Sequence, residues 1–170
     1  APYRVIQRDA AGTVLSDRAG DCIALAILIP LEERAASLTL YSETGYHLCS
    51  LLAYGEGALP AWYKEWAPTL EKLDYLIVSA HPDDDQLFMG AVIPTYTGGC
   101  GLQGTVLYMT CRTRERYTEA LNGLWETGLT NLPVFAFFRD GTPDQNEMWD
   151  YGDYDAVVLY LVRQFRALRP

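Results

Sequence analysis

From residue 73 onward, short apolar runs alternate with longer amphipathic stretches, and this alternation constrains the fold more than any other feature. The apolar runs predict strands at 75–80, 105–110 and 133–138. The spacing of apolar residues between and after these runs predicts helices at about 85–96, 114–127 and 153–168. Strands that alternate with helices of this length are typical of βαβ units. We therefore expect an α/β domain with a parallel sheet and flanking helices over residues 73–170.

The first 60 residues have a different pattern. Short runs rich in β-branched, leucine and aromatic residues predict strands at 23–29, 37–41 and 48–54. Glycine-containing turns separate these runs, which favours an antiparallel pairing. We expect an accessory β-rich module over residues 1–60 and a linker rich in tryptophan and proline over residues 61–72.

Composition limits the classes of partner. The chain has 170 residues, of which 49% are hydrophobic, so it can form a core. It carries 13 Lys and Arg against 22 Asp and Glu, and its net charge of -9 disfavours nucleic acid as a partner. The longest apolar candidate, Cys22–Leu31, is too short for a membrane span and contains a proline.

The sequence His81-Pro82-Asp83-Asp84-Asp85 directly follows the first predicted parallel strand. The carboxyl ends of such strands are where open α/β sheets bind ligands. A histidine and a carboxylate three positions apart can hold one divalent cation, and a second carboxylate beside them can transfer a proton. The alternative is a set of acids that cap the following helix. However, three consecutive acids repel one another, and a cation relieves that repulsion.

The four cysteines lack the CxxC spacing of a zinc knuckle. Two interpretations remain open: a Cys22–Cys49 disulfide in an oxidising compartment, or buried free thiols.

The segment Ala80–Asp85 resembles the AHPDDE signature of the PIG-L/LmbE-like family, zinc hydrolases that remove acetyl groups from N-acetylglucosamine units of glycoconjugates. Three later segments are also similar to that family: Leu87–Gly90, Arg116–Gly128 and Phe138–Asp140. The resemblance covers residues 73–170 and implies a Rossmann-like sheet.

The resemblance also implies residue roles. His81 and Asp84 would be ligands of Zn²⁺, and Asp83 would be the general base that takes a proton from water on the metal. Arg116 would contact the substrate, although it also suits a solvated helix start paired with Glu119. Asp140 would bind a sugar hydroxyl or cap a loop.

Two differences from the family pattern are visible. Asp85 replaces the family's glutamate and is one methylene shorter, so a substrate group that it binds must lie closer. The family's third ligand is a histidine that follows a later strand, whereas this sequence contains only His47 and His81. His47 lies in the β module and fits a turn residue better than a metal ligand. We expect the sheet to be truncated before its last strands, with a remaining C-terminal segment that supplies the third ligand.

The leading hypothesis from the sequence is a zinc-dependent de-N-acetylase that acts on a small-molecule or glycan substrate. We expect the protein to be secreted or in the cell envelope, with the cytoplasm as the alternative. The alternatives are a catalytically incomplete glycan-binding domain and an amidase acting on another N-acyl substrate.

Overall fold

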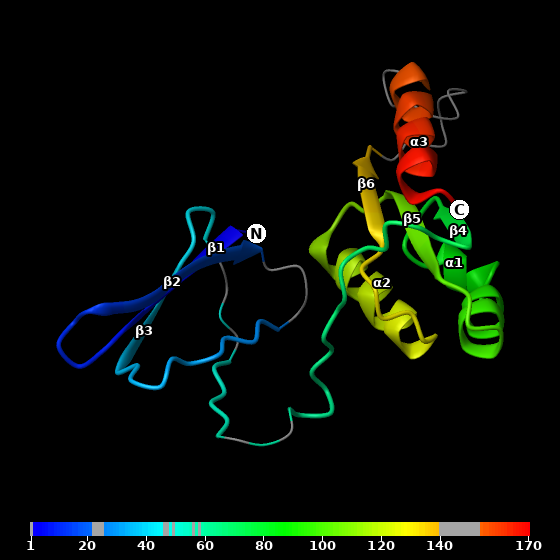
Figure 1. Cartoon of the computed structure of the whole chain (residues 1–170). Helices are drawn as coiled ribbons and strands as arrows, with labels where there is room; N and C mark the ends of the chain where they lie inside the picture. The colour runs from blue at the N-terminus through cyan, green and yellow to red at the C-terminus, as the bar shows by residue number, and fades with distance from the viewer. Residues whose placement is uncertain are drawn as a thin grey trace. The chain divides into compact units, whose positions relative to one another are not determined.

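The computed structural model describes residues 2–21, 26–45, 48, 50–55, 57, 59–139 and 154–170. The chain divides into two compact units, Ala1–Lys64 and Glu65–Pro170 (Figure 1). This division falls inside the predicted linker. Among the described residues, no helix is both long enough and apolar enough to cross a bilayer.

The first unit is built on a three-stranded antiparallel sheet. Its strands are β1 (Pro2–Arg8), β2 (Val14–Asp21) and β3 (Ser37–Tyr41), in the order β2-β1-β3. The hairpin between β1 and β2 is closed by Asp9, whose Oδ1 accepts hydrogen bonds from the backbone N–H groups of Ala11 and Thr13, each at 2.9 Å. Gly12 allows this turn because its φ is 85°. The predicted antiparallel pairing is thus confirmed.

The individual strands of this unit were predicted less well. Only the strand at 37–41 is correct; residues 26–29 and the described residues of 48–54 are not in strands, and the rest of those two ranges lie outside the described residues. β1 and β2 were missed. β2 is largely polar, with sequence VLSDRAGD, so a search for apolar runs passes over it. Its pairing is stabilised by the turn and by a cross-strand ion pair in which Arg4 Nε donates to Asp17 Oδ1 at 2.7 Å.

The second unit contains a parallel sheet at the positions that the sequence predicted. Its strands are β4 (Tyr75–Ser79), β5 (Gly104–Thr110) and β6 (Val134–Phe138), in the order β4-β5-β6. β5 is the central strand and is buried along its whole length. Gly104 is required at its start, because a Cβ there would lie 2.0 Å from the ring of Tyr75.

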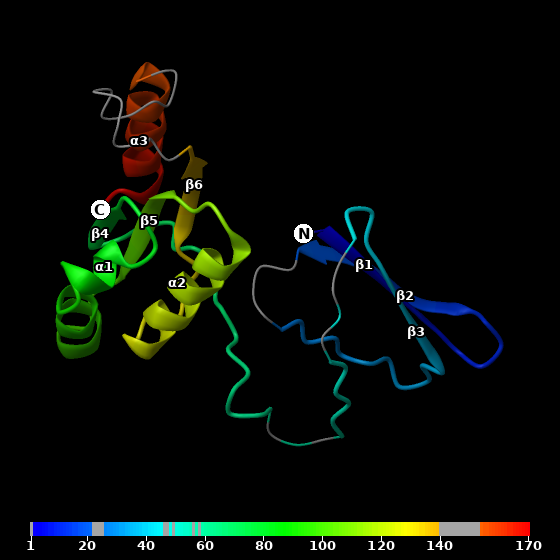
Figure 2. The ribbon, with the colours of Figure 1, turned by 180° about the vertical axis from the view of Figure 1, so that it is seen from behind.

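Helices cover both faces of this sheet. Val106 and Tyr108 of β5 pack in a cluster with α2 (Arg114–Glu126). Leu107 and Met109, which point the other way, pack with α3 (Tyr154–Leu168). Figures 1 and 2 show α1 and α2 on one side of the sheet and α3 on the other. The unit is therefore a three-layer α/β arrangement of the Rossmann-like kind.

The helix predicted at 85–96 is wrong as a continuous element. The structure has a four-residue α1 (Asp84–Leu87), a turn, and a π-helix η1 (Pro94–Gly99). A Cβ at Gly90 would lie 2.5 Å from the carbonyl oxygen of Gln86, so the chain turns there at a position that needs glycine. Pro94 also lacks the N–H that an α-helix would use.

Candidate functional site

The turn that follows β4 is fixed to the neighbouring strand. Ser79 Oγ donates to the carbonyl oxygen of His81 at 2.7 Å. The carbonyl oxygen of Ala80 accepts hydrogen bonds from the backbone N–H and the Oγ1 of Thr110 on β5, both at 2.9 Å. These bonds hold the His81–Asp85 segment at the carboxyl edge of the sheet.

His81 and Asp84 lie together, as the sequence predicted for a pair of metal ligands. His81 Nδ1 is 3.3 Å from Asp84 Oδ2, which also accepts a hydrogen bond from the His81 backbone N–H at 3.0 Å. Two atoms bound to one tetrahedral zinc ion at about 2.0–2.1 Å would be roughly 3.3 Å apart, from the tetrahedral angle. The pair therefore fits one edge of such a site, and the same separation also suits a long hydrogen bond.

Among the described residues, no third protein ligand joins this pair. Over the described residues, no group of three His, Cys, Asp or Glu side chains is placed to hold a metal ion. His47 and Asp140 both lie outside the described residues. The described part of the chain thus brings together two predicted ligands, whereas a catalytic zinc site normally has three protein ligands.

Asp83 occupies a strained position between these two residues in sequence. Its φ is 152° and its ψ is -28°, values that a residue other than glycine rarely adopts. Such strain costs on the order of 1–3 kcal/mol and is concentrated at functional sites. Although Asp83 is the N-cap residue of α1, its side chain makes no capping hydrogen bond. The helix-cap interpretation therefore does not account for this carboxylate.

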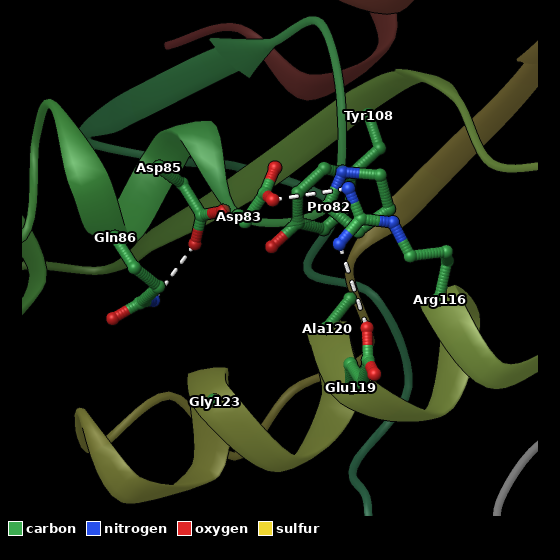
Figure 3. Close-up of a pocket in the computed structure, with 9 residues that line it drawn as sticks. All are labelled: Pro82, Asp83, Asp85, Gln86, Tyr108, Arg116, Glu119, Ala120 and Gly123. Atoms are coloured by element: carbon green, nitrogen blue, oxygen red, sulfur yellow. Dashed lines mark hydrogen bonds and ion pairs between the residues drawn. The ribbon is translucent and has the colours of Figure 1, made fainter.

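The Asp83 side chain instead pairs with Arg116 from α2. Arg116 Nη2 donates to Asp83 Oδ2 at 3.0 Å, and Nη1 donates to Glu119 at 3.5 Å (Figure 3). The hydrogen bond to Asp83 raises the pKa of the Arg116 guanidinium, and burial opposes this only in part. Arg116 therefore pairs along its own helix with Glu119, as one sequence interpretation expects, and also reaches the His81–Asp85 segment; its contact with a substrate stays a prediction.

The N-terminus of α2 places this arginine. Thr113 is the N-cap residue, and its Oγ1 accepts a hydrogen bond from the Arg116 backbone N–H at 3.3 Å. Because Arg116 lies in the first turn of α2, its side chain starts at the same sheet edge as the turn after β4.

A pocket of about 110 Å³ lies between the turn after β4 and α2 (Figure 3). Three predicted site residues line it, namely Asp83, Asp85 and Arg116. His81 and Asp84 are not among its lining residues. The structure therefore brings the predicted base and two predicted substrate contacts to one pocket and places the predicted metal pair beside it.

Two of the lining residues are buried and polar, namely Asp85 and Tyr108, which are 1% and 0% exposed. Asp85 Oδ2 accepts a hydrogen bond from Gln86 Nε2 at 2.8 Å, whereas Asp85 Oδ1 has no hydrogen-bond partner among the described residues. Tyr108 Oη also lacks one. Burial raises the pKa of Tyr108, and so, to a smaller extent, do the nearby negative charge of Asp85 and a side-chain hydrogen bond with it, although the hydroxyl and the carboxylate do not meet at full hydrogen-bond geometry.

Tyr108 was not recognised as a site residue from the sequence. Its position in an apolar strand indicates core, and its ring does stack on Phe135 at 5.2 Å. The available signal was its place near the carboxyl end of β5, the strand next to the His81–Asp85 segment.

The cysteine predictions are only partly covered by the structure. Cys22 and Cys49 lie outside the described residues. Cys100 and Cys111 are free thiols; Cys100 is exposed, so the expectation of burial is wrong there. Cys111 is half-buried, and burial raises the pKa of its thiol while Arg116 opposes this.

Comparisons with protein-family models, with curated proteins and with solved structures give no match for this chain.

Proposed function

We propose that this chain belongs to a zinc-dependent amide hydrolase of the PIG-L/LmbE kind, which removes an N-acetyl group from an N-acetylglucosamine-containing glycoconjugate. The observation that carries the proposal is the arrangement at the end of β4. There, His81 Nδ1 and Asp84 Oδ2 lie 3.3 Å apart, as in a chelating pair, and Asp83, which has a strained backbone conformation, accepts a hydrogen bond from Arg116 of α2.

In this proposal His81 and Asp84 hold Zn²⁺ together with a ligand from outside the described residues. The metal ion, when bound, would supply the Lewis acidity that makes water more acidic and polarises an amide carbonyl. Asp83 accepts a proton from the attacking water and returns it to the leaving amine, as a carboxylate within hydrogen-bond reach can.

The ion pair with Arg116 orients Asp83 for this role. Both side chains are about two-fifths exposed, so the Asp83 carboxylate would rotate in solvent if it had no partner. The hydrogen bond from Arg116 Nη2 to Asp83 Oδ2 restricts this rotation. A substrate oxygen that takes over this hydrogen bond from Arg116 would leave Asp83 free to accept a proton. Arg116 then serves both as a positioning residue and as a substrate contact.

The charge of the pocket disfavours an anionic substrate group. Asp83, Asp85 and Glu119 contribute three carboxylates to the lining, against the single guanidinium of Arg116. An acetamide and the neutral hydroxyls of a sugar are compatible with this surplus, whereas an anionic group is repelled.

A second candidate is a glycan-binding domain without catalysis. It is favoured by one observation, that the described residues supply only two metal ligands. Zinc would then be held weakly or not at all, and the pocket would serve only for binding. An amidase acting on another N-acyl compound is the third candidate, because the same groups could attack any acetamide.

The test is acetate release from a panel of N-acetylglucosamine glycosides, with the full chain treated with chelator and then reloaded with Zn²⁺. We expect activity to disappear on chelation and return with zinc. Asp83→Asn should retain zinc and lose turnover, and the matched control Asp74→Asn, on an exposed residue outside the pocket, should retain both. Saturable sugar binding without zinc uptake or acetate release would favour the glycan-binding domain.

A further inference from the structure

Gly123 of α2 is a glycine that neither backbone conformation nor packing requires. Its backbone is helical and its φ is not positive, so other residues adopt the same conformation without strain. Outside its own helix backbone, a Cβ at this position would meet only the side chain of Gln86, at 3.9 Å, which is an ordinary van der Waals distance. The turn that ends α2 uses a different glycine, Gly128, whose φ is 98°. Because glycine is among the poorest helix formers, its presence at position 123 needs another reason.

The open space beside Gly123 is part of the pocket that contains Asp83 and Arg116. Gly123 lines this pocket and faces Gln86 of α1 across it (Figure 3). Arg116, Ala120 and Gly123 follow one another at helical spacing, so they share one face of α2. From the rise of an α-helix, Arg116 and Gly123 begin roughly 10 Å apart along the helix axis. The pocket therefore runs from a charged end at Arg116 to a second end at Gly123.

The two ends of the pocket differ in polarity. At the first end, the guanidinium of Arg116 is paired with Asp83 at 3.0 Å and with Glu119 at 3.5 Å. At the second end, the lining includes the methyl group of Ala120 and the bare backbone of Gly123. Most of the surface that the pocket presents to a ligand is apolar. Such a lining favours a hydrocarbon group at the second end, because burial of apolar surface stabilises binding there.

We propose that the end of the pocket at Ala120 and Gly123 binds the acyl chain of the substrate, and that Gly123 determines how long this chain can be. This role of Gly123 rests on the proposed function, in which an N-acyl compound is the ligand. The amide oxygen lies at the Arg116 end, and the acyl chain extends along α2 towards Gly123. The absence of a side chain at position 123 makes room for a chain longer than acetyl.

The test compares two neutral probes, the methyl glycosides of N-acetylglucosamine and N-butyrylglucosamine, which differ by two methylene groups. Each is titrated into the metal-free full chain at neutral pH, with backbone amide NMR shifts as the readout. We expect saturable shifts at Gln86, Ala120 and Gly123. The butyryl glycoside should bind more tightly by about three- to tenfold, because its two additional methylene groups are removed from water.

Substitution of Gly123 should change chain-length preference and stability in opposite directions. Gly123→Ala should weaken binding of the butyryl glycoside by about threefold or more, and Gly123→Leu by about tenfold or more, with the acetyl glycoside kept within about twofold. Gly123→Ala should also raise the midpoint of thermal unfolding by about 2–6 °C, because alanine is the better helix former. If Gly123→Leu fails to fold, Gly123→Ala and the comparison of the two probes still decide.

Gly98→Ala is the matched control. Gly98 lies in η1, outside the pocket, and a Cβ there would have no neighbour within 4 Å. This substitution should leave the affinity for both glycosides within about twofold.

Four results would overturn the proposal. Equal affinity of the native chain for the two glycosides means that the acyl chain is not bound. A preference for butyryl that Gly123→Ala leaves unchanged means that the chain lies elsewhere. A lower unfolding midpoint for Gly123→Ala means that packing requires the glycine. Absence of saturable shifts means that the pocket takes no N-acyl sugar.

The proposed hydrolase activity is decided separately, because this assay contains no zinc and measures no hydrolysis. Chain-length preference at Gly123 without acetate release would reject the hydrolase and leave the role of Gly123 standing. Zinc-dependent acetate release without that preference would do the reverse.

Discussion

The two units of this chain are stabilised in different ways. In the described part of the first unit, only Val5 and Gln7 are buried, and the backbone pairing of the sheet is supplemented by a tight turn, an exposed ion pair and the hydrogen bonds of Gln7. In the second unit, all 7 residues of β5 are buried and helices cover both faces. The comparison shows that the candidate site lies on the unit with a real core, where packing can hold side chains in a fixed geometry.

The largest expected effect on stability follows from this difference in burial. Leu107 is 0% exposed on β5, and Leu107→Ala should lower the free energy of unfolding of the second unit by about 2–5 kcal/mol. Leu51 in the first unit is 75% exposed, and Leu51→Ala should change the free energy of unfolding of the first unit by less than about 0.5 kcal/mol. Urea unfolding of the full chain measures both. Similar losses for the two variants would contradict the assignment of the core to the second unit.

The second-largest expected effect concerns Gln7, the buried polar residue of the first unit. Gln7 Nε2 donates to the carbonyl oxygen of Pro30 at 2.9 Å, and Gln7 Oε1 accepts from the Glu32 N–H at 2.9 Å. Gln7→Leu leaves both backbone groups without these partners and should cost about 1–3 kcal/mol. The readout is amide hydrogen exchange in β1 and β3. Unchanged protection there would mean that the loop after β2 does not depend on this side chain.

A smaller effect distinguishes two tyrosines of the second unit. Tyr75 Oη shares a hydrogen bond of 2.7 Å with Thr97, so Tyr75→Phe should lower stability by about 0.5–1.5 kcal/mol. Tyr108 Oη has no partner among the described residues, so Tyr108→Phe should leave the stability of the ligand-free chain unchanged or raise it slightly. Thermal unfolding of both variants is the measurement. A clear loss for Tyr108→Phe would show that its hydroxyl is already satisfied.

The smallest effect concerns the pH dependence of the first unit. The hydrogen bond from Arg4 lowers the pKa of Asp17 below its ordinary value. A carboxylate with a depressed pKa stabilises the fold above its unfolded-state pKa, and this contribution disappears as the pH falls through the folded-state value. The difference in hairpin protection between the native chain and Asp17→Asn should therefore be present at neutral pH and vanish in strong acid. A difference that persists in strong acid would contradict this origin.

Sequence reasoning was reliable where the signal was local and strong. The three apolar runs and the helices Arg114–Glu126 and Tyr154–Leu168 were found within about a residue or two, because their periodicity is clear. The placement of His81 at the end of a parallel strand followed from the same signal. In the first unit, the polar strand β2 has no such periodicity, since its pairing is set by the turn at Asp9.

Three features depend on tertiary structure and could not be predicted from local sequence patterns. The contact between Asp83 and Arg116 joins residues 33 positions apart and follows from how the chain returns along α2. The break after α1 depends on the close approach of Gly90 to a carbonyl oxygen. The unpartnered hydroxyl of Tyr108 is visible only once its neighbours are in place.

The most direct test of the account is calorimetric titration of the metal-free full chain with Zn²⁺, in parallel with His81→Ala, Asp84→Asn and the control Asp74→Asn. We predict weak binding of one equivalent that His81→Ala and Asp84→Asn each remove and the control retains, because these two side chains form one edge of the proposed site. Binding that survives both substitutions, or no binding by the native chain, would contradict the central claim that this pair grips a metal ion.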